Sequence, residues 1–398
     1  MASVVLPLFV LSAGGSATVV GIITFVCTLV AVASQALAGA LVDRLSPARA
    51  FRMASTMQAV CWGTLALIVI RHEHPTWPLV GAIGAIAMGF SSLCYPSEGA
   101  LIKVLVSPEQ FGRAAAVSQG REAAAGLLGG PTGGALFGVA AVLGISAQAA
   151  MHAIAALLVP SPDERTVGAA GSKHAGQGYL SDVIDGFHAS LQHYHLRSIT
   201  VVAALMNLPM AALPLTLILY FQSRGFSAGL IGMMSACVGV GVLGGSFISG
   251  ALTGRYTVGS LGVMALGGYV TTVLLVVILH ESFVWTCVSL VASGFLLPAF
   301  NSAISAYTIT VTPPERVGRV TSAIAVPGMA LMPLGPLLAG VLFDQAGVRL
   351  TLAVVWLLAL GPFLVAAVSP GFRTTPGLAA LTEGTSCAVT APERTAND

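Results

Sequence analysis

Arg121 and Glu122 are adjacent ionisable residues about two turns inside a long apolar stretch, residues 114–138. If this stretch crosses a bilayer, two such groups at membrane depth cost free energy and are by default candidates for function. A carboxylate there could take part in proton coupling or in a gate pair. Glu122 lies four residues before Gly126, so both share one helical face. In the alternative interpretation, the two side chains neutralise each other or neighbouring chains and are only structural.

The composition decides what surrounds these charges. The chain has 398 residues, of which 56% are apolar and 8% charged, with a net charge of +2. Soluble domains carry about 25% charged residues, so a soluble enzyme and a disordered protein are both excluded. The small net charge provides no basic face for nucleic acid. Five of the six cysteines lie in apolar runs, which indicates free thiols rather than a disulfide or zinc framework. We therefore expect an integral membrane protein.

Eleven apolar segments approach or exceed the length of about 20 residues that a spanning helix needs. They are residues 17–42, 53–70, 77–97, 114–138, 141–159, 198–221, 228–252, 258–279, 283–303, 318–343 and 348–369. A twelfth segment, Met1 to Ser12, is apolar but short. We interpret it as the outer half of a first helix whose inner half is absent from this chain, with a signal peptide that lacks a basic start as the alternative.

The distribution of Lys and Arg predicts the orientation of these helices. With the first helix running outward, thirteen Lys and Arg fall in the inside loops and tail and three in the outside loops. Cytoplasmic loops carry the excess of positive charge. Both termini are therefore expected to be cytoplasmic, in a cell membrane.

The sequence also repeats itself. LAGALVDR at 37–44 matches ISGALTGR at 248–255, and PEQFGR at 108–113 matches PERVGR at 314–319. The pair Gly130-Pro131 recurs as Gly335-Pro336, and Ser16-Ala17 recurs as Ser227-Ala228. The offsets lie between 205 and 211 residues. Such a repeat covers six helices, an even number, so the two halves should be parallel and related by an axis along the membrane normal.

The loop 39–49, GALVDRLSPAR, resembles the G-x-L-x-D-R-x-G-R-R signature of the major facilitator superfamily, and the chain resembles the bacterial drug and siderophore exporter-type branch of it. Ser46 replaces the usual glycine, and the second copy has Gly254 where Asp43 stands. The resemblance implies an all-α polytopic fold of two pseudo-symmetric six-helix bundles that rock in alternating access.

The resemblance also implies a conformational gate at Asp43. In the family this carboxylate holds one conformer by facing the N-terminus of helix eleven, whose partial positive charge favours an anion. Arg44 and Arg49 belong to the same signature, and the repeat nominates Arg319 at the start of helix eleven as the partner. Alternatively, Asp43 is a solvated loop carboxylate in a surface pair contributing about 0–1 kcal/mol.

A glycine-rich element forms the second resemblance. It resembles the G-x-x-x-G-P-x-x-G-G element of exporters that run against protons, with one glycine displaced to 133. Its members are Gly126, Gly130, Pro131, Gly133 and Gly134, repeated in part as Gly335 and Pro336. Positions 126, 130, 134 and 138 are spaced by four and line one helix face, which permits close backbone approach. Gly241 and Gly245 are the expected facing groove, and a plain packing stripe is the alternative.

Other polar residues give weaker signals. Asn207, Gln35, Gln58 and Asn301 are candidates for the central cavity, or else make interhelical hydrogen bonds. The family's drug antiporters carry an arginine in helix four, whereas the predicted helix 77–97 has no charge. His188, His193 and His195 fall in a predicted amphipathic helix, 181–197, so no metal site is expected. Motifs of serine hydrolases, zinc proteases and P-loop ATPases are absent, so neither an enzyme nor a cofactor is predicted.

The predicted organisation has four parts. Residues 1–159 form the N-terminal bundle, 160–197 a cytoplasmic linker with the amphipathic helix, 198–369 the C-terminal bundle, and 370–398 a disordered tail. The predicted function is efflux of a small organic molecule by a monomeric secondary carrier that the proton gradient drives. Alternatives are an uptake symporter or uniporter, and a non-transporting sensor or inactive fragment.

Asp43→Asn should lower transport while leaving folded protein in the membrane, because it removes the negative charge that the helix N-terminus attracts. Transport in cells, normalised to membrane-inserted protein, measures this. Unchanged transport refutes the assignment of Asp43 as a gate.

Overall fold

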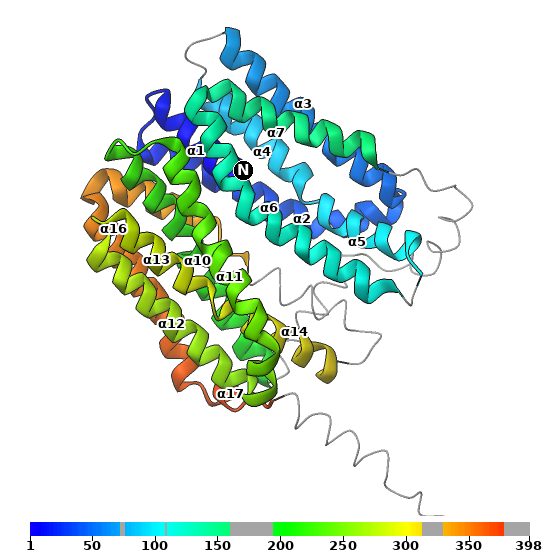
Figure 1. Ribbon diagram of the computed structural model, residues 1–398, viewed down its shortest axis with the longest axis vertical. Helices are drawn as coiled ribbons and strands as arrows, with labels where there is room; N and C mark the ends of the chain where they lie inside the picture. Colours follow the sequence, from blue (N-terminus) through cyan, green and yellow to red (C-terminus); the bar gives the residue numbers. More distant parts are fainter. Residues whose placement is uncertain (72–75, 108–109, 160–193, 313–328, 378–398) are drawn as a thin grey trace, which may run out of the picture.

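The computed structural model describes residues 1–71, 76–107, 110–159, 194–312 and 329–377, which are helical and contain no β-strand. The N-terminal half consists of α1 (Ala2–Ser12), α2 (Ala17–Arg44), α3 (Pro47–Arg71), α4 (Trp77–Ser91), α5 (Cys94–Leu105), α6 (Phe111–Val139) and α7 (Ala141–Leu158). The C-terminal half consists of α10 (Tyr194–Ser223), α11 (Ala228–Arg255), α12 (Val258–Leu279), α13 (Phe283–Gly294), α14 (Leu297–Val311), α16 (Leu334–Val368) and α17 (Pro370–Arg373). The halves lie next to each other as two helical bundles (Figure 1).

Nine stretches within the described residues are long and apolar enough to cross a membrane. Two of them join a pair of helices, Trp77–Ile102 over α4 and α5, and Phe283–Val311 over α13 and α14. The stretch over α16 contains the non-helical Gly347, with φ of 72°, so its 35 residues are two helices joined at a turn. Two further predicted segments correspond to α6, which is long but carries Arg113, Arg121 and Glu122, and to the short α1, whereas residues 318–328 of the predicted span 318–343 lie outside the described residues.

Large apolar side chains point away from the protein in a pattern that suits a bilayer. On α7, Met151, Ile154 and Leu157 recur along one face, and Leu157 is 83% exposed. Many helix hydroxyls instead bond within their own helix, as Thr24 does to the Val20 carbonyl and Thr216 to the Ala212 carbonyl. In lipid every backbone and hydroxyl group must find such a partner inside the protein.

The sequence repeat is visible in the backbone. Ser16 and Ser227, 211 residues apart, cap α2 and α11, and each hydroxyl accepts from the amide three residues later. The turns that precede them contain Gly14 and Gly225 with φ of 85° and 78°, a left-handed conformation that glycine adopts without strain. By this offset α1 corresponds to the last turns of α10, since Ser12 and Ser223 end the two helices.

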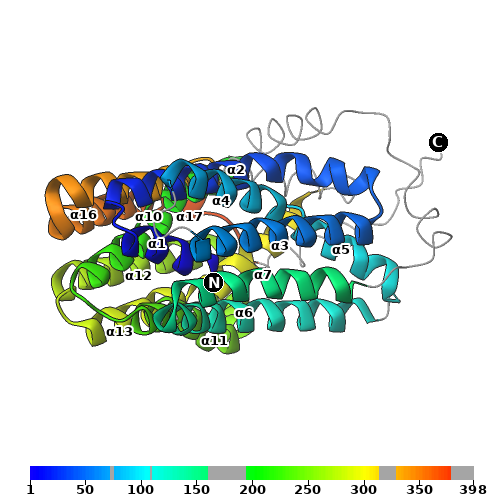
Figure 2. The same cartoon turned by 90° about the horizontal axis from the view of Figure 1, so that it is seen from above.

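The helices of the two halves also choose equivalent partners. In the N-terminal half α3 packs on α7 and α2 on α4, as the second part of α16 packs on α12 and α11 on α13 in the C-terminal half. Two contacts join the halves most extensively, α6 with α11 and α2 with α16. The sequence repeat relates these two contacts, because α2 corresponds to α11 and α6 corresponds to the first part of α16. Figure 2 shows α2 beside α16 on one side of the molecule and α6 beside α11 on the other.

The disordered tail predicted from residue 370 is wrong at its beginning. Residues 370–373 form α17, and the Phe372 ring is 1% exposed because it packs against Phe300 and over Gly262. The backbone continues with a hydrogen bond from the Gly259 amide to the Thr375 carbonyl. One apolar side chain thus anchors the segment. Residues 378–398 lie outside the described residues, as does most of the predicted amphipathic helix, whose positions 194–197 begin α10.

Phe372→Ala should lower the melting temperature in detergent, because truncating a buried phenylalanine costs about 3–5 kcal/mol locally. A thermal unfolding assay measures it. Val368→Ala, at a side chain that is 75% exposed, is the matched control and should change little. Equal melting temperatures for both variants contradict the anchoring role.

Candidate functional site: the contact between the two halves

The first inter-half contact is a crossing of α6 and α11 made by glycines. A Cβ built on Gly130 would lie 2.7 Å from the Gly232 carbonyl oxygen, and one built on Gly134 would lie 3.0 Å from the Gly232 Cα and closer still to the Ala228 carbonyl. Distances under about 3 Å leave no room for a side chain. The two backbones therefore approach this closely only because these positions are glycine.

The second contact, of α2 with the first part of α16, repeats this design. A Cβ on Gly21 would lie 2.8 Å from the Pro336 carbonyl oxygen and 3.0 Å from the Gly340 Cα. A Cβ on Gly340 would in turn fall inside contact distance of the Ala17 carbonyl. Ala17 and Gly21 correspond to Ala228 and Gly232 at the offset of 211. The two halves therefore meet through two copies of one backbone contact.

Both crossings lie near the same ends of the helices. They involve the first turns of α2 and α11 and the last part of α6 and of the first α16 segment, which the charge distribution places on the outer side. Towards the other ends, the ribbons of α6 and α11 diverge in Figure 1. Gly126 lies on that part of α6, where a Cβ would meet nothing within 4 Å. The two halves are thus in contact along α6 from the predicted outer side as far as Leu127, which still meets Gly239 of α11, and the two helices diverge beyond it.

Several predicted members of the glycine interface face elsewhere. Gly133 packs on Met1 and Val5 of α1, within its own half. Gly335 packs on the Leu208 carbonyl and the Ala212 amide of α10, also within its own half. The structural equivalents are 206 residues apart, so Gly335 corresponds to Gly129, which faces Met1. The pairing of Gly130-Pro131 with Gly335-Pro336 was one residue out of register. Pro131 is half-buried in α6.

The predicted groove of Gly241 and Gly245 is also wrong as an inter-half surface. Both glycines face the backbone of their own half, at the carbonyl of Val291 and that of Phe295. The residues of α11 that meet Gly130 and Gly134 of α6 are Ala228, Gly232 and Ser235, which lie nearer the start of α11. A spacing of four therefore identified a close packing face but not its partner.

The charged site around Arg121 contains Glu98, a residue that the predicted span 77–97 did not include. Arg121 pairs with Glu98 of α5 and not with its neighbour Glu122, and its Nη2 lies 2.7 Å from Glu98 Oε1. The Ser118 hydroxyl donates to the same oxygen at 2.9 Å. The predicted fourth span ended at 97, whereas the apolar stretch continues to Ile102 and so includes Glu98. The Glu98 side chain is 24% exposed and Glu122 is half-buried.

The group of Glu98, Ser118 and Arg121 joins the fourth span (α4 and α5) to the fifth (α6) on the predicted inner side, beyond the crossing of α6 with α11. Lipid would raise the free energy of a carboxylate and a guanidinium, so such a pair is stable where both ions meet each other and water. Chemically, the pair can exchange a proton at the carboxylate or open towards a charged ligand at the guanidinium.

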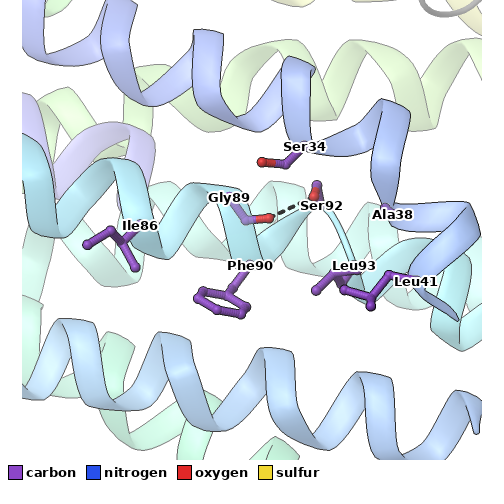
Figure 3. Close-up of a pocket in the computed structure, with 8 residues that line it drawn as sticks. All are labelled: Ser34, Ala38, Leu41, Ile86, Gly89, Phe90, Ser92 and Leu93. Atoms are coloured by element: carbon purple, nitrogen blue, oxygen red, sulfur yellow. Dashed lines mark hydrogen bonds between the residues drawn. The ribbon is translucent and has the colours of Figure 1, made fainter. Parts of the chain in front are cut away.

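A cavity of about 330 Å³ adjoins the break between α4 and α5. Figure 3 shows its lining, which is apolar apart from two hydroxyls: Ser34, Ala38, Leu41, Ile86, Gly89, Phe90, Ser92 and Leu93. The Ser92 hydroxyl donates to the Gly89 carbonyl at 2.7 Å, at the end of α4. The break recurs between α13 and α14, where Gly294-Phe295 stand 205 residues after Gly89-Phe90. Broken helices at matching places in two halves are typical of transporter binding regions.

Comparison with known proteins identifies this architecture. The family model described as Major Facilitator Superfamily matches residues 1–280 and 198–384. The chain belongs to the major facilitator superfamily. A search of curated proteins finds no match.

Two solved structures are similar across almost the whole length. The nucleoside transporter NupG is 15% identical with a TM-score of 0.66, and the alignment covers 92% of each chain. A bacterial homolog of the human lysosomal transporter Spinster, in an inward-facing and occupied conformation, is 14% identical with a TM-score of 0.65, covering 93% of this chain and 92% of that one. At such identity the likeness concerns the fold. As a member of this family, the chain is a multi-pass membrane transporter of a small molecule and not an enzyme.

The predicted family gate is only partly within the described structure. Asp43 and Arg44 occupy the last turn of α2, and their side chains lie outside the part that is described, as does the whole of Arg319. Arg49 is exposed at the start of α3, where its amide donates to the Ser46 hydroxyl at 3.4 Å. The gate assignment therefore stays a prediction.

The polar cavity candidates divide into two groups. Gln58 is 2% exposed and donates to Cys94 Sγ at 3.3 Å, which makes it a core contact between α3 and α5. Asn207 donates to the Ala203 carbonyl of its own helix at 3.1 Å. Gln35 and Asn301 are exposed on α2 and α14. Within the described residues no cluster of three His, Cys, Asp or Glu could hold a metal, and His195 instead contacts the Gly371 carbonyl.

Gly134→Ala should weaken the contact between α6 and α11, because the added Cβ would collide with the Ala228 carbonyl and the helices must move apart. We expect a lower melting temperature and altered transport. Gly126→Ala, two turns away on the same face, meets open space and should be neutral or stabilising by up to about 1 kcal/mol, since alanine favours helix. If the two variants behave alike, this crossing does not depend on its glycine.

Proposed function

We propose that this transporter exports a small amphipathic organic molecule in exchange for protons, as a monomer in the cell membrane with both termini cytoplasmic. The observation that carries the proposal is the α6–α11 crossing, where Gly130 and Gly134 bring the two halves into backbone contact. These glycines belong to the element of helix five that resembles that of proton-driven exporters. The export direction rests on this resemblance.

The type of contact between the two halves supports alternating access. The crossings at Gly130–Gly134 and Gly21–Gly340 are mostly backbone against backbone, and the one side chain seated on these glycines, that of Ser235 against Gly130, is small. Such surfaces allow two rigid bundles to tilt over each other with little repacking. With the predicted outer side in contact, the described conformation corresponds to a carrier that is open towards the cytoplasm, the state that loads a substrate for export.

Glu98 and Arg121 support proton coupling. The Glu98 carboxylate is the acceptor shared by the Arg121 guanidinium and the Ser118 hydroxyl. A proton on Glu98 would remove the ion pair and leave a weaker hydrogen bond between the charged guanidinium and a neutral carboxyl group. Protonation would then loosen helix four from helix five. Such a change links the charge of one carboxylate to the position of the helices beside the cavity.

The cavity at the helix-four break supports the amphipathic class of substrate. Six of its eight lining residues offer no polar side chain, and Phe90 presents an aromatic ring, while Ser34 and Ser92 bring hydroxyls. Binding sites of this composition bury the apolar body of a ligand and orient it with few polar groups. A charged group on the same molecule could reach the ionic pair on α5 and α6.

Export should fall when the proton gradient is collapsed. Cells loaded with a fluorescent amphipathic dye should lose it faster when they express the protein, and an uncoupler should remove most of that difference. Accumulation of the dye above the control level, abolished by the same uncoupler, would instead establish uptake. No difference from cells without the protein contradicts transport of this substrate class.

Glu98→Gln should reduce uncoupler-sensitive export at least tenfold, since the neutral amide cannot exchange a proton. Glu122→Gln is the matched control for a neighbouring carboxylate that is not paired with Arg121 in this way. Both variants need equal amounts of protein in the membrane. If Glu98→Gln retains its sensitivity to the uncoupler and Glu122→Gln loses it, then coupling belongs to Glu122.

A further inference from the structure

Asp344 makes a contact between the halves that packing alone does not require. It lies near the end of the first α16 segment, three residues before the turn at Gly347. Its Oδ2 accepts from the Thr18 amide at 2.7 Å, and its Oδ1 accepts from the Ala17 amide at 3.2 Å. Both amides belong to the first turn of α2. A carboxylate of the C-terminal half therefore holds the start of a helix of the N-terminal half.

The physical chemistry of a helix start explains why this contact is favourable. The first amides of a helix have no partner inside it, and the aligned peptide dipoles place a partial positive charge there. Ser16 satisfies the Val19 amide from within the chain. Asp344 satisfies two further amides and supplies the negative charge that this end favours. The contact therefore combines two hydrogen bonds with a charge at a dipole, and separation of the halves must break all three.

The crossing of α6 with α11 has no carboxylate at the equivalent position, so this contact is present at only one of the two crossings. Gly134 corresponds to Gly340 and Gly130 to Pro336, both 206 residues apart, so the counterpart of Asp344 is Gly138. A Cβ built on Gly138 would lie 3.9 Å from the Gly229 amide nitrogen at the start of α11. Gly229 is the counterpart of Thr18. The start of α11 thus lies beside position 138, where glycine has no side chain that could accept a hydrogen bond from its amides.

We propose that Asp344 is a positioning residue of the transport cycle: it latches the start of α2 to the end of the first α16 segment, stabilises the conformation closed on the predicted outer side, and releases when that side opens. The latch deepens the proposed alternating access and depends on it. It makes the α2–α16 contact the stronger of the two. When the outer side opens, the α6–α11 contact, which has no ionic bond, should yield at lower cost.

The latch can be measured as a distance without any transport assay. Spin labels on cysteines at Leu143 and Val284, in a background free of native cysteines, report the separation of the halves near their predicted outer ends. Both positions are exposed, on α7 and α13. Asp344→Ala should shift the population towards longer distances by about two- to fivefold, the range expected from a charge at a helix start. Asp344→Asn, which keeps an acceptor oxygen, should shift it less.

Moving the latch separates it from a merely structural role. Gly138→Asp in the Asp344→Ala background should restore the short distance, because the new carboxylate can accept from the Ala228 and Gly229 amides of the other crossing. A local folding defect at 344 would not respond to a change at 138. An unchanged distance distribution in Asp344→Ala, or no recovery with Gly138→Asp, overturns the latch. Loss of proton-driven export with an intact distance response would overturn the proposed function and leave the latch in place.

Discussion

The arrangement of the two halves depends on the close approach of backbones at two glycine crossings. At each, a side chain larger than hydrogen would meet a carbonyl oxygen or a Cα of the opposing helix, as for Gly134 against α11 and Gly340 against α2. In lipid, where apolar side chains gain nothing by leaving the solvent, such close packing is a main source of helix association. The same smoothness limits how firmly the halves are held, which suits a protein whose bundles must move.

The directions of the helices at these crossings account for the position of Asp344. By the predicted topology, α2 runs inward and the first α16 segment runs outward, so the end of each lies beside the start of the other. A carboxylate at either end can then cap its partner. Asp344 does so on one side, and the family resemblance assigns Asp43 the equivalent task on the other. Helices two and eleven would thus carry one charged contact for each closed state, with the glycine crossing between.

Much of this could be predicted from the sequence, and the failures have definite causes. The spans followed from runs of apolar residues, and the equivalence of Ser16 and Ser227, which the structure shows as helix caps, followed from an exact repeat. The glycine face was found but was assigned to the wrong neighbours at Gly133 and Gly335. A shift from 205 to 206 residues turns a helix by about 100° and moves a residue to another partner. Glu98 was missed because the apolar run was ended one residue too early, and contacts such as that of Asp344 with α2, over 300 residues away, leave no local pattern.

The duplicated framework keeps its packing in both halves, but the ionic group around Glu98 and the carboxylate of Asp344 each occur in only one half. At offsets of 205 and 206, Glu98 falls on Ala303 or Ile304, Ser118 on Ala323 or Ile324, and Arg121 on Val326 or Pro327, so the sequence of the C-terminal half offers no copy of the ionic group. Asp344 likewise has its counterpart in Gly138. An exact two-fold axis along the membrane normal would give both halves, and both crossings, the same part in the tilting motion. Because these charges break the symmetry, in the proposed cycle a proton on Glu98 would act on one half alone and the proposed latch at Asp344 on one crossing alone, so the two crossings would separate at different costs.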